Sequence, residues 1–486
     1  MKKLLVSAIV VLMASPAFAA IQNVKVSGDI TSTWVGRSNF DLGTTLGSEG
    51  LGTVLSNPQP VGLKRQNVFI TQTRLRVDAD LSDNVSTTVG LINERAWGAE
   101  GAFATGSTQA QNTDVQIYLA SVTMRELLYS PLTVTVGRQI FNYGNGLIMG
   151  DGGPNNQSRG DLQFIAQDLT MRTTRDGVKA ILDYKPLTID LFYFKNGQFL
   201  VNGNPITKKS SSDVYGINAN YQLSDPWSTV VETYIFSRIN GNDITGVTTS
   251  NRGDTLFVPG LRASTNPVKG LNVQGELAWQ LGNHPVVVSG VNEAERRRAM
   301  AAQLLASYAL PVYQKYKPSV NASYTYVSGD KNGSTNFGAD AVSSAKHYTA
   351  WDPFNENQGD GTIYNTLFPL TNMHIVAIGA SANPMEDVTA AFTWSGLWAA
   401  DSYSSGTTSE NPLLLFQPDG GTGTISPATK HDARALGNEY DVNLTYNYTE
   451  DVTFGVSLGW FVPGSIFTNN NNNTASQALA DVAVKF

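Results

Sequence analysis

The sequence of 486 residues contains no cysteine, and charged residues make up only 15% of it. Without cysteine the chain has no disulfide framework, no Cys-based zinc site and no thiol nucleophile. The charged share lies below the ~25% usual for soluble domains, yet no apolar run approaches the ~20 residues that a membrane-spanning helix requires. The formal charge of −7 also disfavours a nucleic-acid-binding protein, whose contact surface is basic.

The first 19 residues have the pattern of a secretory signal peptide. Lys2 and Lys3 precede the apolar stretch LLVSAIVVLMA, and the small residues AFA end at Ala19. This apolar stretch is too short for a hydrocarbon core of ~30 Å, so a membrane helix is disfavoured. We therefore expect an exported chain that begins near Ala20 and forms one domain over residues 20–486.

Period-two alternation of apolar and polar residues runs through most of that domain. In EYDVNLTYNY, which begins at Glu439, the residues Tyr440, Val442 and Leu444 alternate with polar ones. One face of such a strand suits lipid and the other suits water. About eighteen candidate strands begin near residues 24, 68, 85, 114, 132, 174, 187, 213, 229, 255, 271, 300, 318, 374, 388, 436, 452 and 475. An even number is typical of bacterial outer-membrane barrels.

The connections between these strands alternate between short and long. Short joins such as SDN at 82, YKP at 184 and TED at 449 separate long polar insertions at about 38–65, 98–112, 143–172, 197–212, 239–254, 282–299, 328–373, 399–435 and 462–474. Short periplasmic turns and long extracellular loops produce this pattern, whereas a soluble propeller would repeat every ~40–45 residues. The sequence therefore predicts an all-β fold: one transmembrane antiparallel β-barrel of about 18 strands in the cell outer membrane. We expect the stretches 143–172 and 328–373 to fold over or into its lumen.

The chain ends inside a candidate strand, ALADVAVKF, whose apolar residues are Ala480, Val482, Val484 and Phe486. In a closed barrel the last strand pairs with the first, here near VKVSGDI at residue 24. We expect the ring of Phe486 on the lipid face at the periplasmic end. A terminal phenylalanine also resembles the signal that presents outer-membrane proteins to the barrel-assembly machinery.

Strand phase assigns many charged residues to the lumen. In FITQTRLRVDADL the lipid phase holds Phe69 and Leu75, so Arg74, Arg76 and Asp78 face inward. An arginine on the lipid face at the bilayer midplane would cost ~2–4 kcal/mol. The same argument turns inward Arg175, Lys179, Arg238, Arg262, Glu94, Asp183, Asp190, Glu232, Glu276, Glu439 and Asp441. Arginine and lysine in a pore favour anions, but the comparable number of acids leaves open a lumen whose charges simply pair.

Several blocks together resemble the alginate export family of outer-membrane channels. They are VTVGRQIFNYGNGLIMG at 134–150, TTRDGVKAILDY at 173–184, PSVNASYTYVSGDKN at 318–332, IYNTLFPLTNMH at 363–374 and LGNEYDVNLTYNYTEDVTFGVSLGWFVPG at 436–464. The resemblance implies a monomeric barrel of eighteen strands that passes an anionic polysaccharide by diffusion through a charged lumen. Its partners would be that polysaccharide or a small anionic solute, the lipid bilayer with lipopolysaccharide, and the barrel-assembly machinery.

The resemblance also suggests Arg138 as a pore residue, although strict alternation places it with Val134 and Val136 on the lipid side. A bulge at Gly137 would turn the side chain inward. The candidate pore-lining set is therefore Arg74, Arg76, Asp78, Arg138, Arg175, Lys179, Arg262, Glu276, Glu439 and Asp441.

We expect no enzyme, no cofactor and no metal centre. The four histidines, at 284, 347, 374 and 431, are scattered in or beside predicted loops, so no catalytic set is apparent. The stretch WDPFNENQGDG at 351 is rich in oxygen ligands but lacks EF-hand spacing, which leaves loop calcium as an alternative. A plugged, energised transporter is disfavoured because the first strand begins soon after Ala20. A general uptake porin for sugars or organic anions stays open.

Overall fold

The structure is a computed structural model. It describes residues 23–40, 42–43, 65–98, 115–150, 166–198, 200–201, 204–205, 211–240, 254–288, 291–330, 347–357, 361–401, 433–467 and 472–486. The expected signal peptide, residues 1–19, lies outside the described residues. No helix in the described part of the chain is both long and apolar enough to cross a membrane.

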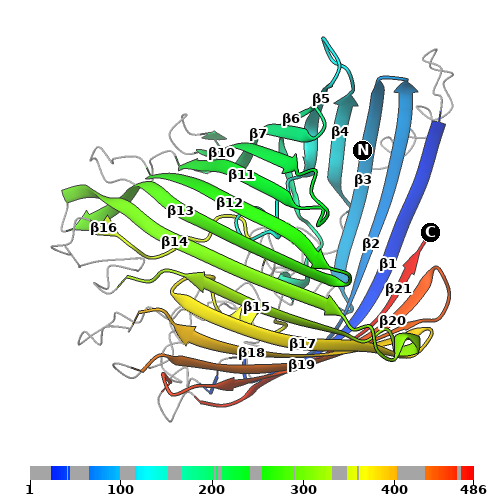
Figure 1. The fold of residues 1–486 in the computed structure, drawn as a ribbon, viewed down its shortest axis with the longest axis vertical. Helices are drawn as coiled ribbons and strands as arrows, with labels where there is room; N and C mark the ends of the chain where they lie inside the picture. Colours follow the sequence, from blue (N-terminus) through cyan, green and yellow to red (C-terminus); the bar gives the residue numbers. More distant parts are fainter. Residues whose placement is uncertain are drawn as a thin grey trace.

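Within these residues, eighteen long strands form a closed antiparallel barrel (Figure 1). They are β1 (Asn23–Ser38), β2 (Arg65–Ser82), β3 (Val85–Ala96), β4 (Gln116–Met124), β5 (Leu132–Ile140), β6 (Thr174–Asp183), β7 (Leu187–Gln198), β10 (Ser211–Gln222), β11 (Val230–Asn240), β12 (Asp254–Val268), β13 (Leu271–Val288), β14 (Val291–Ala309), β15 (Ser319–Val327), β17 (Met373–Met385), β18 (Val388–Ala399), β19 (Ala435–Asn447), β20 (Val452–Pro463) and β21 (Ala475–Lys485). The fold class and the strands predicted from alternation are confirmed. Two short strands, β8 (Leu200–Val201) and β9 (Asn204–Pro205), form a separate hairpin, and β16 (His347–Tyr348) pairs in parallel with β14.

The barrel closes because β1 pairs with β2 on one side and with β21 on the other. The last residue completes this register: the Gly28 amide donates to the Phe486 carbonyl at 2.8 Å, and the Phe486 amide donates to the Gly28 carbonyl at 3.0 Å. The Phe486 ring is exposed and covers Gly28, where an added Cβ would lie 2.6 Å from the ring. The predicted pairing of the C-terminal strand with the first strand is therefore confirmed.

The two ends of the barrel differ, as the alternation of loop lengths predicted. Turns such as 83–84, 184–186 and 448–451 join neighbouring strands at one end, close to Asn23 and Phe486. The prediction of a long loop over 282–299 is wrong, because β13 and β14 continue as a paired ribbon to Val288 and Val291. The sequence of this extension shows no period-two alternation, because apolar and charged residues follow one another in runs, VVV at 286–288 and ERRR at 295–298.

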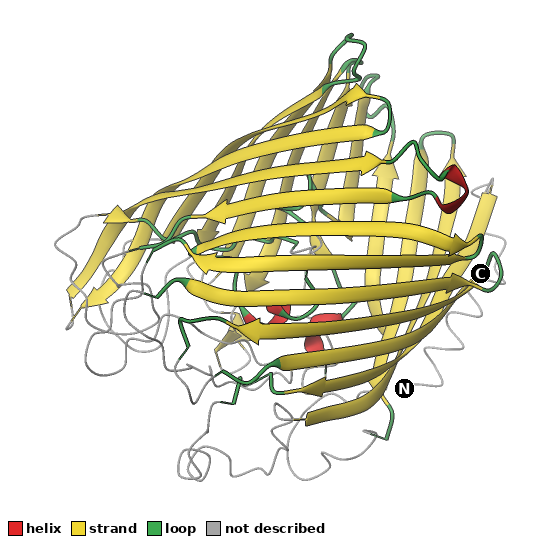
Figure 2. Ribbon diagram, turned by 60° about the horizontal axis from the view of Figure 1, so that its bottom comes forward, coloured by secondary structure: helices red, strands yellow, loops and turns green. Residues whose placement is uncertain are grey.

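The described chain of the stretches 143–172 and 328–373 folds back into the barrel from the long-loop end, as predicted. Two of its short helices, η1 (Gln167–Leu169) and α2 (Tyr364–Leu367), lie within the ring of strands (Figure 2). A third, η2 (Gln314–Tyr316), belongs to a short-end turn. One apolar cluster joins the inner chain to inward side chains of the strands, including Phe141, Trp351, Phe368, Phe194 and Phe236. Part of the barrel interior is therefore dry.

Candidate permeation pathway

Arg74 and Arg76 on β2 face the water-accessible part of the lumen. Their neighbours Phe69 and Leu75 are exposed on the outer face, so alternation turns the two arginines inward as predicted. The Arg74 and Arg76 side chains keep 34% and 48% of their surface exposed. Guanidinium groups can therefore meet a solute here.

Each of these arginines has a carboxylate partner. Arg74 Nε lies 2.9 Å from Asp29 Oδ1, and Arg76 Nε lies 2.7 Å from Asp78 Oδ2. Thr88 donates a further hydrogen bond of 2.6 Å to Asp78. We call Asp29, Arg74, Arg76 and Asp78 the lumen charge patch. It combines both signs of charge on adjacent inward positions of β1 and β2.

Glu439 and Asp441, also predicted to line the pore, instead hold α2. Glu439 is fully buried and accepts hydrogen bonds from the backbone amides of Thr362, Ile363 and Tyr364 at 2.6, 2.8 and 2.6 Å. The Thr362 hydroxyl donates to Asp441 at 2.6 Å. The Glu439 carboxylate of β19 thus accepts hydrogen bonds from amides at the N-terminal end of the helix, which have no partner within the helix itself.

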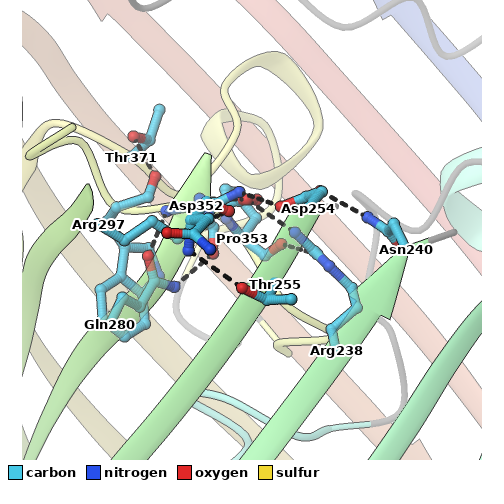
Figure 3. A network of polar contacts seen from close by, with 11 residues as sticks. Arg238, Asn240, Asp254, Thr255, Gln280, Arg297, Asp352, Pro353 and Thr371 are labelled. Atoms are coloured by element: carbon cyan, nitrogen blue, oxygen red, sulfur yellow. Dashed lines mark hydrogen bonds and ion pairs between the residues drawn. The ribbon is translucent and has the colours of Figure 1, made fainter. Parts of the chain in front are cut away.

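Asp352 is the centre of a second anchor (Figure 3). It lies 2.7 Å from Arg238 of β11 and 2.8 Å from Arg297 of β14, and Arg297 also contacts Asp254 at 2.7 Å. The Gln280 side chain binds both the amide and the carbonyl of Asp352. Burial alone would raise the pKa of Asp352. The two guanidinium groups outweigh this effect and hold the pKa below its ordinary value.

Glu94 of β3 anchors the other inner segment. It is fully buried and accepts hydrogen bonds from the Met171 amide at 2.7 Å and the Thr170 hydroxyl at 2.9 Å, and it pairs with Arg172 at 3.0 Å. Asp168 in η1 pairs with Arg37 of β1 at 2.5 Å. The two inner segments also touch, because the Thr366 hydroxyl lies 3.3 Å from Asp168.

The remaining inward residues of the candidate set also contact the inner chain or one another. Arg175 donates to the Asn355 side chain at 3.2 Å, and Lys179 lies over the Phe141 ring at 5.7 Å. Arg262 pairs with Glu232 at 3.0 Å and donates to Asn145 at 3.1 Å, while Glu276 accepts from the Tyr234 hydroxyl at 2.6 Å. These residues face inward as predicted, but their charges are largely used within the wall and the loops.

Arg138 does not face the lumen, which corrects the suggestion that it lines the pore. It shares the outer face with Val136 and Ile140, and it pairs with Asp176 at 2.6 Å. Gly137 has a φ of +120°, but the pairing with β6 continues without a shift. An added Cβ at Gly137 would meet the Ala120 carbonyl at 2.1 Å, so the glycine permits a close strand contact and does not turn the arginine inward.

Sequence phase did not identify the aromatic part of the lumen. The rings of Phe192, Phe194 and Phe236 occupy inward positions and contact the rings of Tyr143 and Phe141 of the folded-in chain, and Tyr234 stacks on Phe236. The signal was present in LTIDLFYF, where the inward phase becomes apolar at its upper end. An apolar inward phase predicts a wall that is covered by protein rather than by water.

No cluster of three or more metal-binding side chains occurs among the residues that the structure describes. In the stretch that suggested loop calcium, Asp352 is held by two arginines and Asn355 contacts a third. These contacts favour a structural role for that stretch in packing against the wall.

A family model described as "Alginate export" matches residues 37–481. No curated protein matches the chain in sequence. Among solved structures, Pseudomonas aeruginosa OpdK with vanillate has a TM-score of 0.53 at 8% identity, covering 96% of this chain and 99% of its own. Acinetobacter baumannii OccAB1 has a TM-score of 0.53 at 9% identity, covering 97% and 99%. P. aeruginosa OccK2 (OpdF) with glucuronate has a TM-score of 0.50 at 9% identity, covering 96% and 98%. At these identities the structural likeness supports the fold alone.

Proposed function

This chain belongs to the alginate export family of outer-membrane channels, and from that premise we propose that its barrel conducts an anionic polysaccharide of the alginate type. Passage is passive and follows the gradient of the polymer. The observation that carries the proposal is the lumen charge patch, where the Arg74 and Arg76 side chains are 34% and 48% exposed on the inner wall.

The chemistry of the patch suits a chain of sugar carboxylates. A guanidinium group binds a carboxylate through paired hydrogen bonds, and positive groups in a pore favour anions. Asp29 and Asp78 limit how strongly each arginine holds a carboxylate, because they compete for the same donors. A solute that binds weakly at successive points can leave again, as conduction requires.

An uptake porin for small organic anions is the second candidate. It is favoured by the inner segments, which occupy part of the lumen and leave less room for a polymer. Two of the solved neighbours were crystallised with small carboxylates, OpdK with vanillate and OccK2 with glucuronate. The same arginines serve both functions, so the size of the permeating solute distinguishes them.

The surroundings of the channel are part of the proposal. We place the mature chain, 20–486, as a monomer in a bilayer that contains lipopolysaccharide, with its short turns in the periplasm and assembly by the barrel-assembly machinery. The family and the fold are those of channels rather than of enzymes. The charge of the lumen and the family give no reason to include nucleic acid among the partners.

The proposal is tested by recording single channels of the purified barrel in planar phospholipid bilayers. Soluble polyuronate should block the small-ion current, and a neutral glucan of the same length should block it far less. Equal block by both polymers would contradict recognition of the carboxylates. Block by monomeric uronate, without permeation of oligomers in a liposome efflux assay, would favour the small-anion porin.

A further inference from the structure

The outer face of the β13–β14 ribbon changes from apolar to cationic toward the long-loop end. Three successive outward pairs cross the two strands: Trp279 with Met300, Leu281 with Arg298, and Asn283 with Arg296. Trp279, Leu281 and Met300 are all exposed. This face of the ribbon therefore presents lipid-compatible side chains first and guanidinium groups immediately beyond them.

The orientation of the two arginines is fixed by the residue between them. Arg297 is only 2% exposed and reaches inward to Asp352 and Asp254. Because neighbouring side chains of a strand point to opposite faces, Arg296 and Arg298 point outward. Of these three consecutive arginines, Arg297 therefore belongs to the inner anchor, and Arg296 and Arg298 belong to the outer surface.

Their place beyond the exposed apolar pairs is the one expected of side chains at the boundary between acyl chains and lipid headgroups. A strand advances about 3.4 Å per residue, so Arg298 and Arg296 stand about 7 and 14 Å beyond the Trp279–Met300 pair along the ribbon. Exposed tryptophan is typical of the membrane interface. Charged side chains there sit beside lipid phosphates rather than within hydrocarbon.

Neither arginine has a carboxylate partner in the described part of the chain, where the neighbouring Glu295 is buried. A guanidinium group presents a planar fork of donors that matches phosphate oxygens. We propose that Arg296 and Arg298 form a docking surface for the phosphate groups of a phosphorylated glycolipid in the outer leaflet of the outer membrane. This inference rests on the proposed orientation, with the long loops outside the cell.

The opposite end of the barrel provides a matched control. Lys315 and Lys317 lie in the short turn between β14 and β15, also two residues apart and also cationic. They belong to the periplasmic end, where a docked outer-leaflet lipid has no access in the membrane-embedded protein. Neutralising either pair removes the same charge from the protein.

The experiment compares the wild type, Arg296→Gln/Arg298→Gln and Lys315→Gln/Lys317→Gln by native mass spectrometry in detergent. The lipid probes are bisphosphorylated lipid A, its monophosphorylated form and phosphatidylglycerol. Heat-modifiable migration on gels first shows that each variant is folded. We expect lipid A to bind at least tenfold more weakly to the arginine variant than to the wild type, and the lysine variant to match the wild type.

The proposal is overturned if the arginine variant keeps wild-type lipid A binding, or if the lysine variant loses as much. Wild-type binding of phosphatidylglycerol as strong as that of lipid A would overturn it too, because the surface would then be a general anionic-lipid site. Single-channel current in bilayers without lipid A tests the channel function separately, so failure of one leaves the other standing.

Discussion

The charged residues of the lumen differ in their exposure to water and in the number of their charged partners. Arg74 and Arg76 are partly exposed to the lumen, whereas Arg297 is almost completely buried and shared between Asp254 and Asp352. Exposed ion pairs contribute little to stability, whereas a buried charge that loses its partner is costly. We therefore propose that the exposed arginines set selectivity, while the buried Arg297 supports the structure of the same wall.

Changing Arg74 and Arg76 to Glu should shift the reversal potential in a salt gradient toward cation selectivity and weaken block by polyuronate. The substitution reverses two charges that face the lumen while keeping water-compatible side chains. Single substitutions give the control: Arg76→Gln should lower anion preference, and Arg138→Gln, on the outer face, should leave it unchanged. An equal response to both would mean that selectivity does not arise in the lumen charge patch.

Replacing Asp352 by Ala should destabilise the folded barrel by roughly 3–5 kcal/mol, because Arg238 and Arg297 would lose a shared buried carboxylate. Asp78→Ala is the comparison, since its pair with Arg76 is exposed and should change the free energy of unfolding by about 1 kcal/mol or less. Urea unfolding in detergent micelles measures both. A similar loss in the free energy of unfolding for both variants would show that the Asp352 contacts stabilise the barrel no more than an exposed ion pair does.

At the scale of elements, the inner segments occupy part of the lumen and are held there by several strands. Glu439 of β19 and Glu94 of β3 bind chain that enters from the long-loop end, and Asp352 of that inner chain binds Arg238 of β11 and Arg297 of β14. A loop held at several points is expected to remain inside the barrel rather than to open and close as a free lid.

The segment 347–357 should respond to pH through Glu356. Burial raises the pKa of this carboxyl group to about 7 from 4.5, and the nearby Asp352 adds to the effect. Because the folded-state pKa is the higher one, the neutral form favours docking. The docked segment is most stable below about pH 4.5 and loses on the order of 3 kcal/mol as pH rises to about 7, with no further change above.

Single-channel recordings at pH 5 and pH 8 test this expectation. Current fluctuations from a loosened segment should be more frequent at pH 8, and Glu356→Gln should make the two records alike. Persistent pH dependence in that variant would assign the effect to another group. Fewer fluctuations at pH 8 than at pH 5 would contradict the sign of the argument.

The strands could be predicted from sequence because lipid and water impose alternate side chains along each of them. The same alternation correctly turned Arg262, Glu276 and Glu439 inward. It could not show that these groups bind inner chain, since Thr362 and Asn145 are distant in sequence and carry no periodic pattern. It also could not decide which face of the barrel Arg138 occupies, because the role of Gly137 depends on its close approach to the Ala120 carbonyl of a neighbouring strand.

At the scale of the whole molecule, closure makes the C-terminus a structural element. Deleting Phe486 removes two backbone hydrogen bonds with Gly28 and the ring that covers it. We expect a smaller fraction of heat-modifiable, folded barrel after expression in cells. Refolding from urea into detergent, without any cellular machinery, separates the causes: a defect there too would reflect closure, and a normal yield there would indicate a lost assembly signal.

The dry aromatic sector behind Phe192, Phe194, Tyr234 and Phe236 has a consequence for engineering this barrel as a molecular sensor. The inner chain also contacts β1 through Arg37 and β3 through Glu94, so the wall that an analyte can meet is the part of β1 and β2 toward the short-turn end, which carries the lumen charge patch. Current signatures should therefore depend more on substitutions in β1 and β2 than on equal substitutions across the bore. The lumen charge patch could therefore be redesigned without changing the residues that hold the inner chain in place.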